Sequence, residues 1–171
     1  MPRRVAIVTG GGRGIGRAIS IGLAQDGAAV AVNYTRDEEA AQATVDAIAA
    51  LGGRAKAYRA SVESFDDDRA MVEAVLADFG KIDILINNAG IASRGQSVRD
   101  TDPAEMERVV RTHAFGSFYM SQLVLDSMRA QERGDIVMIS SVAASSFGPN
   151  GSPYNMGKGA LEALAYTLAK E

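Results

Sequence analysis

The sequence contains no cysteine and no tryptophan, and it has one histidine, His113, among its 171 residues. A chain without cysteine forms no disulfide and offers no thiolate for catalysis or metal binding. A single histidine also excludes the histidine clusters that hold many metal ions. The composition therefore predicts a protein without a metal centre.

Long apolar runs and an excess of one charge are absent as well. No stretch approaches the ~18 apolar residues of a membrane-spanning helix, and the first apolar run is too short for a secretory signal. The formal net charge of −3 provides no basic surface for nucleic acid or an anionic membrane. We therefore expect a cytoplasmic protein that binds neither nucleic acid nor membrane.

What remains is an ordinary globular composition, with 47% hydrophobic and 23% charged residues. Without a repeat or linker, the chain is expected to form one domain over residues 1–171. Short, nearly continuous apolar runs alternate with longer segments of helical spacing, which predicts a Rossmann-type, doubly wound parallel α/β sheet covered on both faces. The expected strands are Val5–Thr9, Ala28–Asn33, Ala55–Tyr58, Ile82–Ile86 and Asp135–Ile139, and the expected helices are Ile15–Gln25, Glu38–Leu51, Asp67–Phe79, Ala104–Gln131 and one from Pro153 onward.

Several helix ends carry capping signals. Thr35 and Glu38 have the spacing of a capping box, and Asp102 stands before Pro103 as a cap before a first-turn proline. Glycines follow three of the expected helices where C-terminal caps belong. They are Gly27, the pair Gly52 and Gly53, and Gly80.

The loop after the first strand is rich in glycine. Its spacing is G-x-x-x-G-x-G, which is neither the commoner G-x-G-x-x-G nor a P-loop. Glycines let the backbone approach a pyrophosphate, and the following helix N-terminus supplies N–H groups and a positive dipole. A plain tight turn is the alternative, but the position after the first strand favours a nucleotide. The expected contact residues are Gly10, Gly12, Arg13, Gly14, Ile15 and Gly16.

The end of the second strand bears on the choice of nucleotide. An NAD site is expected to have an acidic residue there for the ribose hydroxyl, whereas this chain has Asn33. Arg36 follows closely, and Arg13 lies in the glycine loop, so two guanidiniums favour the 2′-phosphate of NADP(H) over NAD(H). An ordinary solvated Arg36 is the alternative.

Tyr154 and Lys158 lie four residues apart and share one face of the last helix. Gly157 and Gly159 flank the lysine, although each costs a helix about 1 kcal/mol relative to alanine. We therefore expect that something approaches this turn closely.

Four motifs in order, TGGGRGIG, NNAG at Asn87–Gly90, Ser141 in ISSV, and Tyr154-x-x-x-Lys158, make the chain resemble the short-chain dehydrogenase/reductase family over its whole length. It resembles the family's β-ketoacyl-acyl carrier protein reductases most. The resemblance implies that Tyr154 protonates a carbonyl oxygen as NADPH delivers hydride and that Ser141 holds that oxygen. It implies that Lys158 binds the nicotinamide ribose and favours the ionised tyrosine. Asn88, Ala89 and Gly90 would form the wall beside the adenosine ribose.

The chain departs from the family pattern at three places. His113 stands where the family usually has an asparagine that holds a water in a proton relay to the lysine, so it is either a catalytic residue with an altered role or a tolerated packing residue. A protonated ring beside Lys158 is disfavoured by like charge. Ser61 replaces an aspartate that usually meets the adenine amino group, while Val62 remains. The sequence ends at Glu171, before the C-terminal elements that the resemblance implies. Either the sequence is a shortened one or the protein lacks these elements.

The sequence therefore predicts an NADPH-dependent reductase of a small-molecule or carrier-linked ketone, with a 3-oxoacyl substrate preferred. A catalytically impaired nucleotide-binding protein and a sugar or alcohol dehydrogenase of the same family are alternatives. A structural or partner-binding module would not explain the co-occurring motifs. Surplus apolar residues on the helices at Glu105–Met128 and from Tyr154 onward predict a homodimer or homotetramer.

Overall fold

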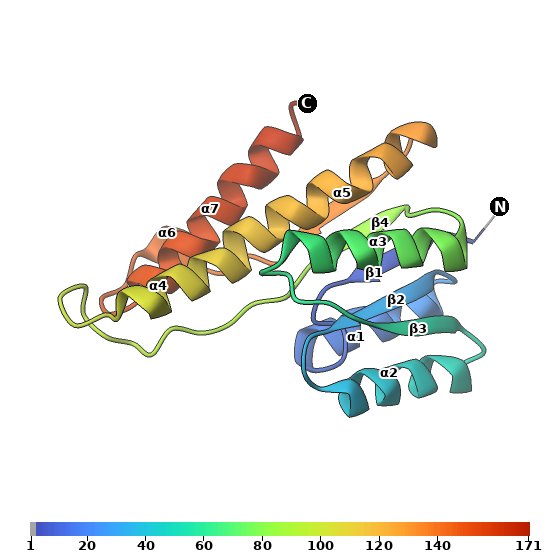
Figure 1. Ribbon diagram of the computed structural model, residues 1–171, viewed down its shortest axis with the longest axis horizontal. Coiled ribbons are helices and arrows are strands. Elements are labelled where there is room, and N and C mark those ends of the chain that lie inside the picture. Colours follow the sequence, from blue (N-terminus) through green and yellow to red (C-terminus); the bar gives the residue numbers. More distant parts are fainter. Residues whose placement is uncertain (1–2) are drawn as a thin grey trace.

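Five parallel strands form one sheet in the order β3-β2-β1-β4-β5, as the computed structural model shows for residues 3–171 (Figure 1). The order reverses between β1 and β4, which both pair in parallel with their neighbours. In such a sheet, ligands bind at the carboxyl ends of the strands near this reversal. The predicted Rossmann-type fold is confirmed. The strands are β1 (Val5–Val8), β2 (Ala29–Tyr34), β3 (Arg54–Arg59), β4 (Ile84–Asn87) and β5 (Asp135–Met138).

Helices cover both faces of the sheet (Figure 1). On one face, α1 and α2 pack over Val8, Val30 and other strand residues. On the other, α3 and α5 pack over Ile7 and Leu85 with buried methionine and valine side chains. The short helix α4 and the last helix α7 contact each other beyond this second layer. The helices are α1 (Gly14–Gln25), α2 (Glu38–Ala50), α3 (Phe65–Phe79), α4 (Pro103–Val110), α5 (Gly116–Ala130), α6 (Ala143–Ser146) and α7 (Ser152–Leu168).

Two features differ from the sequence prediction. The single helix expected over Ala104–Gln131 is divided, because a π-helical turn at Arg111–Phe115 separates α4 from α5. The edge strands β3 and β5 are also partly exposed along most of their length rather than covered on both faces. Edge positions explain this exposure, since each of these strands has only one neighbour in the sheet.

Most of the predicted helix caps are present. Asp102 accepts a hydrogen bond from the Ala104 backbone at the start of α4, as expected for a cap before proline. The glycines after α1, α2 and α3 adopt positive φ at positions 27, 52 and 80. The predicted capping box at Thr35 is wrong. Asp37 caps α2 by accepting from Ala40 at 3.0 Å, while the Thr35 hydroxyl donates to the Ala60 carbonyl and links two strands instead.

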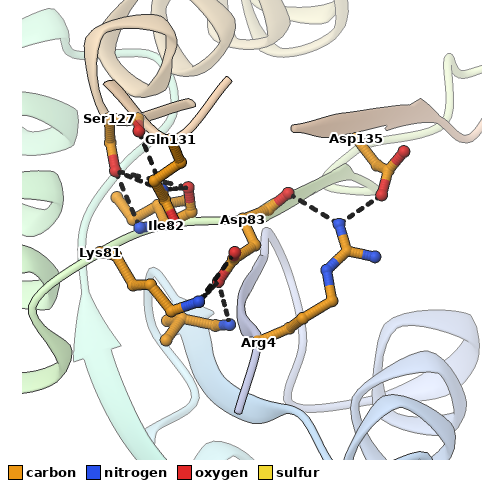
Figure 2. A network of polar contacts seen from close by, with 8 residues as sticks. Arg4, Lys81, Ile82, Asp83, Ser127, Gln131 and Asp135 are labelled. Carbon is orange, nitrogen blue, oxygen red and sulfur yellow. Dashed lines mark hydrogen bonds and ion pairs between the residues drawn. The ribbon is translucent and has the colours of Figure 1, made fainter. Parts of the chain in front are cut away.

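A polar network joins three strands at the edge of the sheet where they begin (Figure 2). Arg4 forms an ion pair with Asp135 and donates to the Asp83 carbonyl at 3.2 Å. The Asp83 carboxylate accepts from the Val5 backbone at 2.7 Å and from Lys81 at 2.9 Å. These contacts fix β1, β4 and β5 at the end opposite the glycine loop.

Within residues 3–171, no helix combines the length and the apolar character needed to cross a membrane. The same residues contain no cluster of histidine and carboxylate side chains suited to a metal ion.

Candidate active site

The glycine loop is held in its shape by side chains from neighbouring strands. Gly10 has φ +61°, and its N–H donates to the side-chain oxygen of Asn33 at 3.1 Å. The Asn33 amide in turn donates to the Ala60 carbonyl at 3.1 Å. Asn33 therefore connects the glycine loop to the segment after β3. The sequence predicted Asn33 as a cofactor contact, and the structure shows that its side chain also has this structural role.

Close backbone approach explains the glycine at position 16. A Cβ added there would lie 2.2 Å from the Gly10 carbonyl oxygen and 2.6 Å from the amide nitrogen of Asn88. Such distances are impossible for a real side chain. Only glycine lets α1 begin directly against the loop, with its N-terminus at the carboxyl ends of the strands.

The turn after β4 is fastened to the same loop. The Thr9 hydroxyl oxygen accepts from the backbone N–H groups of Asn88 and Ala89, each at 2.9 Å. The Asn88 side chain donates to the Thr9 carbonyl at 2.8 Å. The two motifs that the sequence places far apart thus form one rigid edge of the site.

A cavity of about 680 Å³ opens along this edge. Gly14, with φ +52°, lies on it, and a Cβ there would meet no atom within 4 Å. Open space at a helix N-terminus, walled by backbone and small residues, fits the pyrophosphate of a dinucleotide. All thirteen cofactor-contact residues predicted from the loops line the cavity: Gly10, Gly12, Arg13, Gly14, Ile15, Gly16, Asn33, Arg36, Ser61, Val62, Asn88, Ala89 and Gly90.

The cavity is lined by charged side chains of both signs, which are Arg13, Arg36, Asp37, Glu63 and Arg108. Arg13 and Arg36 are exposed and come from the loops after β1 and β2. After β3, Glu63 accepts from the buried Thr112 hydroxyl at 2.7 Å. Glu63 and Thr112 are not among the residues that the sequence predicts, although the position of Glu63 directly after Val62 points to the first of them.

The predicted catalytic side chains Tyr154 and Lys158 lie together at the start of α7. The Lys158 ammonium lies 5.8 Å from the centre of the Tyr154 ring and donates to the Ile139 carbonyl, at the end of β5, at 2.5 Å. Lysine is almost completely buried here, and this burial lowers the pKa of its ammonium group. The contact with Ile139 fixes the lysine against the segment that leads to Ser141.

Ser141 lies between β5 and α6, and its hydroxyl oxygen accepts from the Ala143 backbone at 3.2 Å. The helix α6 that follows packs against α7, which carries Tyr154. The hydroxyl group is half-buried and retains its own proton for donation.

His113 lies in the π-turn and connects the two halves of the site. Its ring contacts Tyr154 edge-on, with 5.2 Å between ring centres and an interplanar angle of 90°. Its Nε2 lies 2.8 Å from the Ile91 carbonyl oxygen, and Ile91 lines the cavity. The structure thus brings Tyr154, Lys158 and His113 together beside the cavity, although these three residues do not line it.

The chain is similar to known oxidoreductases over nearly its whole length. It is 38% identical over 168 residues to an uncharacterised oxidoreductase of Methylorubrum extorquens, covering 98% of this chain and 66% of the relative. It is 40% identical over 167 residues to a versicolorin reductase of Emericella nidulans, covering 97% and 62%. A 3-oxoacyl-[acyl-carrier-protein] reductase of Staphylococcus aureus is 37% identical over 166 residues, covering 97% and 67%. The chain thus spans about two thirds of the length of these relatives.

Solved structures agree with this likeness. A NAD⁺-bound xylitol dehydrogenase superposes with a TM-score of 0.93 at 34% identity, covering 97% of this chain and 64% of that one. A metagenomic short-chain oxidoreductase in complex with NADP gives the same TM-score at 33% identity, covering 98% and 75%. The family model described as short chain dehydrogenase matches residues 4–171. The predicted resemblance is confirmed, and the chain belongs to the short-chain dehydrogenase family.

Proposed function

We propose that the protein binds NADP(H) and reduces a ketone, with Tyr154 as the proton donor. The observation that carries this proposal is the pairing of Tyr154 with the buried Lys158 at the end of β5, beside a cavity built for a dinucleotide. The two named reductases among the relatives support ketone reduction over other chemistry.

Each side chain has a distinct part in this proposal. Tyr154 gives its phenolic proton to the carbonyl oxygen as hydride arrives on the carbon, so that an alcohol forms. A buried ammonium beside the ring stabilises the tyrosinate that is left. Ser141 donates a hydrogen bond to the same oxygen. The bound cofactor supplies the hydride.

The preference for NADP(H) rests on charge. Arg13 and Arg36 lie on the wall of the cavity after β1 and β2, and no carboxylate stands at the end of β2, where Asn33 is tied to Gly10. Asp37 also lines the cavity, but it caps α2 with its carboxylate. Guanidiniums bind phosphate through paired, charge-assisted hydrogen bonds.

A 3-oxoacyl compound, free or carrier-linked, is the proposed substrate, and the likeness to a xylitol dehydrogenase makes a sugar alcohol the second candidate. The test incubates the protein with NADPH and an acetoacetyl thioester, and in parallel with NAD⁺ and xylitol, while the absorbance of the reduced nicotinamide is followed. We expect the absorbance to fall in the first reaction as NADPH is consumed, and to stay constant in the second because no NADH is formed. Tyr154→Phe should bind NADPH normally and reduce no ketone.

Nucleotide binding without turnover is the alternative from a different class, and the replacement of the family's usual asparagine by His113 is the observation that favours it. In that case NADPH binds with micromolar affinity, and no ketone or alcohol changes its absorbance. The same experiment separates the two functions.

We further propose a homo-oligomer in which α5 and α7 are covered. Phe118 on α5 is 48% exposed and Tyr166 on α7 is 71% exposed, and both are large apolar groups facing water in the single chain. A two-fold partner would cover them with the same surface. The cytoplasmic location stays a prediction.

A further inference from the structure

The backbone of Ile91 fixes one end of the His113 ring. Nε2 of His113 lies 2.8 Å from the Ile91 carbonyl oxygen and 3.3 Å from the Ile91 nitrogen. A ring nitrogen carries either a proton or a lone pair, so the shorter contact selects the tautomer in which Nε2–H donates to the carbonyl. Nδ1 then carries the lone pair, and it has no hydrogen-bond partner within residues 3–171.

The surroundings favour the uncharged form of the ring. Burial lowers the pKa of His113, the hydrogen bond with Ile91 partly opposes this, and the Lys158 ammonium lowers the pKa further. The groups facing the ring from α7 are Tyr154 and Lys158, and the loop after β4 presents only backbone at Gly90 and Ile91. An imidazole held neutral in this way is not suited to exchange a proton at each turnover, because general acid–base catalysis works best with a pKa near the operating pH.

Two glycines leave room for the ring. A Cβ at Gly90 would lie 2.4 Å from Cε1 of His113, which no real side chain permits. A Cβ at Gly157 would lie 3.0 Å from Cβ of His113. The ring is therefore enclosed on one side by the loop after β4 and on another by α7, and its exposed fraction is 1%.

The remaining side of the ring meets Tyr154. The two rings are perpendicular with their centres 5.2 Å apart, a preferred geometry for aromatic pairs. We propose that His113 is a positioning residue, an uncharged ring that holds the Tyr154 phenol edge-on beside Lys158. The inference rests on the proposed function, in which Tyr154 is the proton donor, and it assigns His113 a steric task in place of proton transfer.

Substitutions that keep or remove the ring test this role. His113→Phe keeps a planar ring and should retain kcat for ketone reduction to within about threefold, with an unchanged pH profile. His113→Ala removes the ring, and kcat should fall about 10- to 100-fold while the dissociation constant of NADPH stays the same, because misplacement of a reacting group has this order of effect. His113→Leu replaces the alanine variant if that one does not fold.

Two results would overturn the proposal. Equal losses in the phenylalanine and alanine variants, together with a lost limb of the pH profile, would mean that His113 carries a proton. Full turnover in His113→Ala would mean that it does nothing for Tyr154.

A measurement without turnover separates this proposal from the proposed function. His113 is the only histidine, so isotope-labelled histidine gives one set of nuclear resonances. We expect the neutral Nε2–H form at neutral pH. The Tyr154 ring resonance, identified by its loss in Tyr154→Phe, should shift in His113→Ala and much less in His113→Phe. An imidazolium signal at neutral pH, or an unmoved Tyr154 resonance in the alanine variant, contradicts positioning even if no ketone is ever reduced.

Discussion

Gly157 packs directly against His113 where α7 crosses the π-turn. A Cβ at position 157 would lie 3.0 Å from Cβ of His113 and 3.3 Å from its Cγ and Cδ2. A Cβ at Gly159, two residues further on, would meet no atom within 4 Å. The two glycines beside Lys158 therefore differ in their surroundings. Gly157 permits close packing of two helical segments, whereas Gly159 faces open space.

Alanine at these two positions should change stability in opposite directions. Gly157→Ala forces α7 away from the π-turn by a few tenths of an ångström, and we expect the free energy of unfolding to fall by about 1–3 kcal/mol. Gly159→Ala gains helix propensity without a clash and should raise it by about 1 kcal/mol. Denaturant titration of both variants measures the difference. Shifts of the same sign would contradict the packing described for Gly157.

Cofactor choice should depend on the two guanidiniums of the cavity. Arg36→Ser and Arg13→Ser are each expected to raise the dissociation constant of NADPH about tenfold, because each removes one charge-assisted contact. The dissociation constant of NADH should stay unchanged. Titration calorimetry with both nucleotides gives the four constants. Arg129→Ser, at the end of α5 away from this cavity, is the matched control. Equally weakened binding of NADPH and NADH would show that the arginines do not bind a 2′-phosphate.

Asp68 should make stability depend on pH. The side chain is fully buried on α3, neither carboxylate oxygen has a hydrogen-bond partner in the described chain, and burial, with a smaller effect of Asp67, raises its pKa to about 8. An unfolded aspartate has a pKa of about 3.9. The folded state therefore holds more protons between these values, and the free energy of unfolding should fall as pH rises from about 4 to 8.

Asp68→Val should remove this slope and stabilise the protein at pH 8 by about 1–3 kcal/mol, since it replaces an unpaired buried polar group by an apolar one. Glu73→Gln, on the exposed side of the same helix, should leave the slope in place. Unfolding curves at several pH values are the measurement. A slope that persists in Asp68→Val would assign the pH dependence to another group.

The proposed oligomer should dissociate when the apolar surface of α5 is made acidic. Phe118→Glu places a charge where a partner would bury an aromatic ring, so light scattering at micromolar concentration should show a smaller particle than the unmodified protein gives. Leu51→Glu, an equally exposed apolar position after α2, is the control. A monomer mass for the unmodified protein would refute the predicted oligomer itself.

The parts of the site that the sequence predicted depend on local order along the chain. Gly10, Asn88, Ser141 and Tyr154 each follow a strand or open a helix, and parallel strands bring such positions to one edge of the sheet. The parallel sheet with helices on both faces follows from the same alternation of apolar runs and amphipathic segments. These features need no knowledge of contacts between distant side chains.

The features that the sequence did not predict depend on tertiary contacts. One extra residue in a helical turn leaves no mark in composition, so the sequence predicts one continuous helix where the π-turn lies. Thr35 has the spacing of a cap, but the nearby Ala60 carbonyl takes its hydroxyl hydrogen bond. Glu63 is held at the cavity by a hydrogen bond from Thr112, a residue 49 positions away that the sequence does not place near it.

The π-turn has a consequence for the length of this segment of the chain. Thr112 holds Glu63 after β3, and its neighbour His113 holds Ile91 after β4, so adjacent residues anchor two loops that are 28 positions apart in the sequence. Successive residues of an α-helix point about 100° apart. Deleting one residue between His113 and α5 would rotate α5 by about 100° relative to these two anchors. Substitutions are therefore easier to accommodate here than a change of length, because α5 must keep its buried side chains directed toward the sheet.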